Sequence, residues 1–295
     1  MTLSPETLAA LAEADLDAAW VEALARETVE EDLAGGVDVT SAATVPEDLV
    51  GTAAFASRAA GVLAGVPVAM AVVDVVAGGA AEHLRRSADG TRVQPGDVAV
   101  QVRGPVRALL TAERSALNLL CHLSGVATLT RAWVDAVEGT GAHVRDTRKT
   151  TPGLRLLEKY AVRCGGGVNH RMALSDAALV KDNHVVAAGG VAAAFEAVRA
   201  MWPDLEVEVA CDTVEQVHEV VAAGADLVLL DNMSLADMRA AVDACRAAGV
   251  QTEASGGLRL DNARAVAETG VDFLAVGALT HSAPVLDLGL DLEVR

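Results

Sequence analysis

From about residue 140 onward the sequence repeats one pattern: a short aliphatic run, a turn, and an Ala-rich stretch with helical character. Strands are predicted at 143–146, 177–181, 205–210, 226–230, 250–254 and 273–276. Repeated strand–helix units form a parallel sheet or barrel. Only 2% of the residues are aromatic, so the core must be built from Ala, Val and Leu, as in helices packed on such a sheet. The C-terminal half is therefore predicted to be an open or closed α/β barrel.

The first 140 residues follow a different pattern. Ser4 and Pro5 are suited to the start of a helix, which is predicted to run to about Glu31 and to end before two glycines. Between 51 and 104, strand-like runs at 52–57 and 97–103 flank a helix predicted at 67–76. Residues 105–138 are predicted to be helical, with one break at Ser124–Gly125. This part of the chain is predicted to be a small α+β unit.

A polar residue or glycine closes nearly every predicted strand of the second half. These residues are Asp146, Lys181, Asp182, Asp231, Ser255 and Gly277. In α/β barrels the carboxyl ends of the strands meet at one mouth and carry the chemistry. The active site is therefore expected at these strand ends.

Cationic residues gather around two of these positions. Arg148 and Lys149 follow the first barrel strand, and His170 and Arg171 follow a flexible run of three glycines. Two guanidinium groups, an imidazole and the ammonium group of Lys181 suit a ligand with two adjacent carboxylates, because charge-assisted pairs are strong and directional. A solvated basic surface is the alternative, but it requires neither the glycines nor the strand-end positions. We therefore predict a pocket for a dicarboxylate.

Lysine is rare in this chain. Of its 23 Lys and Arg residues only Lys149, Lys159 and Lys181 are lysines. Lysine offers a compact charge on a flexible stem and arginine a planar fork, so a retained lysine indicates a position with tight geometry. Lys159, next to Glu158, is the exception and is assigned to the surface of a helix.

Glycines and one carboxylate point to a phosphate site. Ser255, Gly256 and Gly257 follow one predicted strand and Gly277 follows the next, where backbone amides can approach an anion at the start of the following helix. Thr280 and His281 add donors beside the second loop. Asp231 could bind ribose hydroxyls or Mg²⁺, which prefers a few carboxylates with phosphate oxygens completing its shell. A cap on the following helix is the alternative role for Asp231.

The net charge of −18 argues against nucleic acid as a partner, since that binding depends on Lys and Arg. A small anionic substrate remains compatible, because the local field of a cleft decides its binding. No run of 18 residues is continuously apolar, and the first residues lack a basic run followed by an apolar one. A cytoplasmic protein that neither spans nor binds a membrane is expected.

Several motifs resemble the quinolinate phosphoribosyltransferase family over about residues 30–292. The motifs are Glu113–Asn118, Leu123–Gly125, Asp146–Arg155, Gly165–Arg171, Val180–His184, Leu230–Asn232, Glu253–Gly257 and Val276–Pro284. The resemblance implies a type II phosphoribosyltransferase fold of class α/β. An N-terminal α+β open-faced sandwich domain, 1–116 joined by 283–295, would accompany an incomplete (β/α) barrel, 117–282, that carries catalysis.

The resemblance also implies an activity and a set of ligands. The family transfers phosphoribosyl from phosphoribosyl pyrophosphate (PRPP) to quinolinate with decarboxylation, giving nicotinate mononucleotide, pyrophosphate and CO₂ in NAD biosynthesis. It works as a homodimer or larger oligomer and uses Mg²⁺. The residues that would bind quinolinate are Arg148, His170, Arg171 and Lys181, with Arg114 supplied by the neighbouring subunit. The residues that would bind PRPP are Lys149, Asp231, Ser255, Gly256, Gly277 and His281.

One position departs from the family pattern. After Val207–Glu208–Val209 the family usually has a second glutamate that binds ribose and metal, whereas this chain has Ala210. Glu208 lies on the same strand face, two residues earlier, so we predict that it joins Asp231 at the metal and in stabilising the positive ribose ring. Lys181 is predicted to stabilise the carbanion that forms when CO₂ leaves.

Two other functions stay open. Ala210 allows a catalytically weakened homologue that binds quinolinate or PRPP without turnover. A lysine at a barrel strand end can also act as the nucleophile of a Schiff-base lyase. A type I phosphoribosyltransferase is disfavoured, because Asn232 follows Asp231 where a second acid is expected.

Overall fold

The structure, a computed structural model, describes residues 2–294 and divides them into two compact units. The first unit contains residues 2–129, 163–165 and 283–294, and the second contains 130–162 and 166–282. The sequence boundary after residue 116 falls inside a continuous helix, α5 (Val106–Ala136), whose residues up to Leu129 pack with the first unit. The two units are described separately.

The second unit contains all the strands predicted after residue 140, each within two residues of its expected bounds. They are β6 (His143–Arg145), β7 (Ala178–Val180), β8 (Val207–Cys211), β9 (Leu227–Asp231), β10 (Gln251–Ser255) and β11 (Phe273–Ala275). Their order is β6-β11-β10-β9-β8-β7, and every neighbouring pair is parallel. Among residues 2–294 no ladder joins β6 to β7. The sheet is therefore an open barrel, as predicted.

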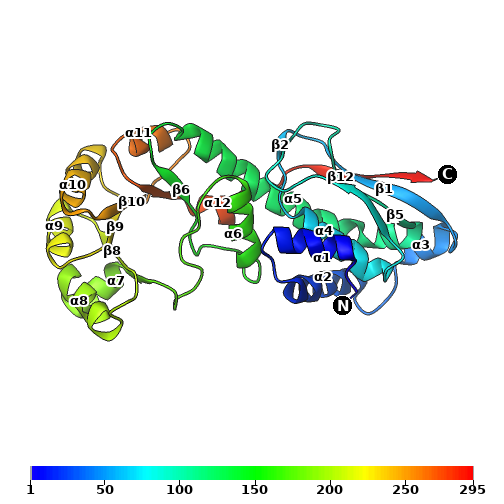
Figure 1. Cartoon of the computed structure of the whole chain (residues 1–295), viewed down its shortest axis with the longest axis horizontal. Coiled ribbons are helices and arrows are strands. Elements are labelled where there is room, and N and C mark those ends of the chain that lie inside the picture. The colour runs from blue at the N-terminus through cyan, green and yellow to red at the C-terminus, as the bar shows by residue number, and fades with distance from the viewer. Residues whose placement is uncertain (1, 295) are drawn as a thin grey trace. The chain divides into compact units, whose positions relative to one another are not determined.

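Helices connect these strands and cover their outer side, as the left part of Figure 1 shows for α8, α9 and α10. The helices of this unit, besides the end of α5, are α6 (Arg155–Cys164), α7 (Asp182–Ala188), α8 (Val191–Met201), α9 (Val214–Ala222), α10 (Leu235–Ala248), α11 (Ala263–Ala267) and α12 (Ala278–His281). The strands are apolar except at their ends and at Glu208, Thr252 and Glu253, because both faces of the sheet are covered. The chemistry is thereby confined to the strand ends and to these two acids.

The first unit is built on an antiparallel sheet of order β12-β1-β5-β3. Its strands are β1 (Val50–Ser57), β3 (Glu82–Arg86), β5 (Val98–Pro105) and β12 (Leu288–Val294), and a separate ladder joins β2 (Gly61–Val62) to β4 (Arg92–Val93). Alternate residues of β1, such as Ala53 and Phe55, are buried, and α4 (Val66–Ala77) packs on β5. The C-terminal strand pairs with β1 along its length (Figure 1). This is the open-faced sandwich that the resemblance implied.

The N-terminal segment forms two helices, so the prediction of one continuous helix is wrong. Ser4 caps α1 (Pro5–Glu13) as expected, accepting a hydrogen bond from the backbone N–H of Thr7 at 3.2 Å. The chain then turns at Asp15, whose φ is 54°, and Asp17 caps α2 (Ala18–Leu33) by accepting from the N–H of Trp20. A short helix, α3 (Val39–Thr44), follows. Two local capping groups therefore outweigh the helical propensity of the connecting residues.

The break predicted at Ser124–Gly125 is also absent, since α5 is helical through both residues. A Cβ atom on Gly125 would lie 2.1 Å from the carbonyl oxygen of Pro284. The hydroxyl of Ser124 bonds to the backbone of Ala64. Small residues here allow two backbone segments to approach the helix, which explains a glycine that does not end it.

No single helix among the described residues is both long and apolar enough to cross a membrane, and one sharply bent pair, α7 with α8, meets the length and composition test jointly.

Candidate active site

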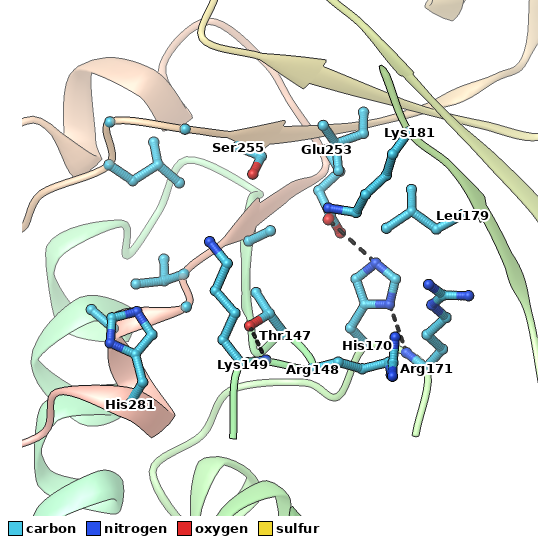
Figure 2. A pocket seen from close by; sticks show the side chains of 18 residues that line it. Thr147, Arg148, Lys149, His170, Arg171, Leu179, Lys181, Glu253, Ser255 and His281 are labelled. Carbon is cyan, nitrogen blue, oxygen red and sulfur yellow. Dashed lines mark hydrogen bonds and ion pairs between the residues drawn. The ribbon is translucent and has the colours of Figure 1, made fainter. Parts of the chain in front are cut away.

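A cavity of about 510 Å³ opens at the carboxyl ends of the barrel strands (Figure 2). Nearly all the predicted site residues line it: Arg148, Lys149, His170, Arg171, Lys181, Ser255, Gly256, Gly257, Gly277 and His281. Of the other three, Asp231 and Glu208 lie elsewhere on the barrel strands, and Arg114 is an exposed residue of α5 in the first unit. The sequence therefore located the cavity and most of its lining.

One wall of the cavity is cationic. Arg148, His170, Arg171 and Lys181 all line it, and Figure 2 shows the side chains of His170 and Arg171 lying side by side. The guanidinium of Arg171 donates to the carbonyl oxygen of Ala177 at 2.7 Å. Burial, and then the nearby Arg148, lower the pKa of Arg171. Because the two neighbouring guanidinium groups repel each other, a bound anion that pairs with both would be strongly favoured here.

A buried ion pair holds this wall in place, and it involves Lys159. The side chain of Lys159 is completely buried, so its assignment to a helix surface is wrong. Its ammonium group donates to the Asp146 carboxylate and, at 2.8 Å, to the carbonyl oxygen of His170. Asp146 also accepts from the N–H of His170 at 2.9 Å and from the amide of Asn169. The pair thus fixes the backbone of His170 from both sides.

Burial raises the pKa of Asp146 and lowers the pKa of Lys159, while their mutual attraction opposes both shifts. The sequence contained a signal for this arrangement. Helix α6 is buried continuously from Leu157 to Val162, so Glu158 and Lys159 both lie inside, and Glu158 accepts from the N–H of Thr151. Two adjacent charged residues in a helix that packs on a strand-end aspartate indicate an internal network.

The other wall carries the glycine loops. Gly256 has a φ of +80°, and a Cβ there would lie 2.2 Å from the side-chain oxygen of Asn232 and 2.7 Å from a carboxylate oxygen of Asp231. A Cβ on Gly277 would lie 3.0 Å from the Lys149 side chain. Only glycine leaves the backbone amides of both loops this accessible. The helix expected directly after Gly257 begins at Ala263, so this loop presents its own amides without a helix start.

Asp231 ends β9 as predicted and lies against the Gly256 loop. Its carboxylate accepts from the side-chain amide of Asn232 at 3.1 Å. The cap of the following helix, α10, is Ser234, which accepts from the N–H of Asp237. Asp231 therefore does not have the alternative role of a helix cap, and its oxygens are available to a ligand.

Glu208 does not join Asp231, so this part of the prediction is wrong. In the ladder between β8 and β9, Glu208 lies opposite Leu227, four residues before Asp231. At roughly 3.3 Å per residue the two positions differ by about 13 Å along the strands, too far for one ion or one ribose to contact both carboxylates. Sharing a strand face, as Glu208 and Ala210 do, fixes the direction of a side chain but not its depth in the barrel.

Glu208 instead belongs to a buried cluster with His170 and Glu253, which we call the acid cluster. The ring Nε2 of His170 lies 2.8 Å from Glu208 Oε2 and 3.5 Å from Glu253 Oε1. Burial raises the pKa of each glutamate to about 7, and burial lowers the pKa of His170. Glu253 was not among the predicted site residues, although an acid in the middle of an otherwise uncharged strand was a signal for it.

Two places bring together side chains of the kinds that bind metal ions, but only one of them suits a metal as it stands. Asp231 offers a hard carboxylate beside a loop suited to phosphate, which fits Mg²⁺ bound mainly by phosphate oxygens. The acid cluster brings ligand atoms within 4.8 Å of one another. However, His170 Nδ1 accepts the N–H of Arg171 at 2.7 Å, so a neutral ring carries its proton on Nε2, the atom facing the glutamates. Nε2 is therefore a donor in this arrangement and not a metal ligand.

Comparisons with known proteins agree with this architecture. Residues 38–124 and 126–291 match the N-terminal and C-terminal domains described as quinolinate phosphoribosyl transferase. A nicotinate-nucleotide pyrophosphorylase (carboxylating) of Mycobacterium leprae is 54% identical over 270 residues, covering 90% of this chain and 95% of that protein. The human protein of the same name is 43% identical, covering 70% of this chain and 71% of its own.

Solved structures give the same result for the fold. The crystal structure of NadC from Streptococcus pyogenes has a TM-score of 0.90 and 37% identity, covering 95% of this chain and 99% of that one. The nicotinate-nucleotide pyrophosphorylase from Francisella tularensis has a TM-score of 0.89 and 38% identity, covering 94% and 98%. With both domains matched and a relative above half identity over nine-tenths of its length, this chain belongs to the quinolinate phosphoribosyl transferase family.

Proposed function

We propose that this protein transfers the phosphoribosyl group of PRPP to the ring nitrogen of quinolinate, with loss of the 2-carboxylate as CO₂. The products are nicotinate mononucleotide and pyrophosphate. The observation that carries the proposal is the pairing of a cationic wall with glycine loops in one cavity. The first suits adjacent carboxylates and the second suits phosphate groups.

Binding and orientation supply the first part of catalysis. Arg148, Arg171 and Lys181 would pair with the two carboxylates of quinolinate, and His170 would lie behind them. The loops at Gly256 and Gly277, with Lys149, would hold the phosphates of PRPP. Placing the ring nitrogen against the anomeric carbon converts an encounter of two dissolved molecules into a reaction within one complex.

Electrostatics supply the second part. As pyrophosphate leaves, the ribose ring gains positive charge, and Asp231 is the carboxylate placed at the loop where that ring would lie. Mg²⁺, when bound to pyrophosphate and Asp231, would neutralise charge on the leaving group. Once the ring nitrogen is alkylated the pyridinium withdraws electrons, so the C2 carboxylate can depart, and Lys181 would stabilise the carbanion left behind.

The weakened homologue is the competing function, and Ala210 is its basis. Ala210 lies opposite Leu229, which lines the cavity, and Leu229 precedes Asp231 by two residues. A glutamate at position 210 would therefore point into the same cavity, nearer to Asp231 than Glu208 is. Asp231 and the phosphate loops remain in place without it, and this favours an active enzyme.

The experiment compares nicotinate mononucleotide formation by the native protein and by Ala210→Glu, with quinolinate, PRPP and Mg²⁺. Product from the native protein supports the proposal. If the native protein forms no product but still binds quinolinate, it is the weakened homologue. Product formation restored by Ala210→Glu would show that the glutamate at this position is the missing ligand.

Two further features belong to the proposal. Arg114 lies on α5 with its side chain 60% exposed and its guanidinium 3.7 Å from the carboxylate of Glu113, and it does not line the cavity of its own chain. We propose that it completes the quinolinate site of a second subunit, which makes a homodimer the active form. Sedimentation together with mixing of Arg114→Ala and Lys181→Ala subunits tests this, since shared sites restore part of the activity. Because PRPP is too highly charged to cross a bilayer unaided, the proposed location is the cytoplasm.

A further inference from the structure

The two glutamates of the acid cluster have no task in the function proposed so far, yet the cluster contacts two cavities. Glu253 and His170 line the main cavity. Glu208 and His170 line a second cavity of about 250 Å³, whose other polar residues include Arg145, Asp176 and Glu206. The cluster therefore connects the substrate site to a separate polar opening within the same unit.

The hydrogen bonds of the cluster leave one proton position unfilled. His170 donates from Nε2 to Glu208 Oε2, and Arg145 donates to Glu253 Oε2 at 2.9 Å. Within residues 2–294 the remaining oxygen of each glutamate, Oε1, has no hydrogen-bond partner. Both side chains are almost fully buried, at 2% and 0% exposed. Buried polar atoms without partners are rare, and a proton held by the two carboxylates would supply the missing donor.

The surrounding charges favour that proton. Glu253 forms an ion pair with the guanidinium of Arg145 from β6, but two buried like charges cannot both ionise readily. The other charged groups near them are Arg171 and Glu206, which act on Glu208, and Lys181, which lines the main cavity together with Glu253. With both pKa values raised to about 7, mainly by burial, the pair retains about one proton near neutral pH.

We propose that Glu253 is the general acid that protonates C2 of the pyridine ring after CO₂ leaves, and that Glu208 passes it the proton. This inference rests on the function proposed above. The bond between C2 and its carboxylate carbon breaks, the electron pair stays on C2, and CO₂ departs. A proton then passes from the glutamate pair to C2, forming the C2–H bond of nicotinate mononucleotide and leaving both glutamates ionised.

The second cavity accounts for the return of the proton. Glu208 lines that cavity and Glu253 does not, so water there can reprotonate the pair through Glu208 before the next turnover. Glu253 lines the substrate cavity and is the catalytic residue, whereas Glu208 acts through it and is a positioning residue. His170 fixes Glu208 by its hydrogen bond and stays neutral, because burial lowers its pKa.

Single turnovers with rapid quenching test the assignment, because they separate pyrophosphate release from CO₂ release. In Glu253→Gln, pyrophosphate is expected to form at the native rate while CO₂ and nicotinate mononucleotide form at least about 100-fold more slowly. The N-ribosylated dicarboxylate should accumulate, because a carbanion that is not protonated recaptures CO₂. Glu219→Gln, the same change on the exposed surface of α9 and away from both cavities, should leave the two rates coupled as in the native protein.

The pH profile of CO₂ release gives a second readout that a purely structural role would not change. The native rate should fall as pH rises and the pair loses its proton. Glu208→Gln removes a like charge beside Glu253, so this limb should move to lower pH by roughly one unit. If Glu253→Gln does not fold, as judged by its melting temperature, this shift alone decides the question.

Equal rates of pyrophosphate and CO₂ release in Glu253→Gln would overturn the assignment, as would an unmoved limb in Glu208→Gln. A native protein that forms no nicotinate mononucleotide would instead reject the proposed function itself.

Discussion

The buried pair of Lys159 and Asp146 makes a quantitative prediction. Lys159→Met preserves the length of the side chain but removes its charge, leaving the fully buried Asp146 without its cation. Breaking a buried pair by removing one partner costs about 3–5 kcal/mol, because the remaining charge is desolvated and uncompensated. The free energy of unfolding of the barrel unit should fall by that amount at neutral pH.

The loss should depend on pH in a defined direction. Without Lys159 the folded-state pKa of Asp146, already raised by burial, rises further. A group whose pKa is raised on folding stabilises the protein at low pH and loses that contribution as pH rises through the folded-state pKa. The difference in free energy of unfolding between the native protein and the variant should therefore be smaller at pH 5 than at pH 8. These two values span the roughly 3 pH units by which burial can shift a carboxyl pKa.

Urea unfolding of the native protein, Lys159→Met, Asp146→Asn and the double variant measures the coupling. The double variant should lose at least about 1 kcal/mol less than the sum of the two single losses, since contacting residues are not additive. Arg239→Met on the exposed surface of α10 serves as control, with a change within about 0.5 kcal/mol. A loss below about 1 kcal/mol in Lys159→Met would refute the reasoning.

Three further predictions concern the cavity and the acid cluster. Lys181→Arg should reduce turnover at least about 100-fold while quinolinate still binds, because the planar fork cannot take the position of the ammonium group; full activity by product assay would remove Lys181 from this role. Gly256→Ala should raise the KM for PRPP far more than Gly257→Ala, since only the first Cβ meets other atoms, although both glycines have positive φ; equal effects in steady-state kinetics would contradict the crowded loop. Stability of the native protein should decline as pH rises between about 4.5 and 7, because folding raises the pKa of Glu208 and Glu253, and urea unfolding of a double glutamine variant should show a flatter profile.

The barrel could be predicted because its strands are short, aliphatic and separated by turn residues. Strand ends of a parallel sheet share one mouth, so Arg148, Lys181 and Ser255 could be assigned to one cavity without coordinates. Local sequence also fixed the cap at Ser4. These features depend on neighbours in the chain or on a rule that all parallel sheets obey.

The errors have a common physical cause. The depth of Glu208 in the barrel depends on the register of β8 against β9, and nothing local to either strand sets that register. Lys159 is buried because of Asp146, 13 residues earlier in the chain. Position 125 needs a glycine although it lies within a helix, because a C-terminal segment passes directly over it. Long-range packing decides each of these positions, so residue type and spacing alone could not.

The most direct test of the central claim is a product measurement on the purified native protein with PRPP and Mg²⁺, using either quinolinate or nicotinate as the acceptor. Quinolinate should give nicotinate mononucleotide, pyrophosphate and CO₂ in equal amounts, and nicotinate should give almost no nucleotide, because it lacks one of the two carboxylates that the cationic wall would bind. Absence of nucleotide from quinolinate, or equal turnover of nicotinate, would contradict the account.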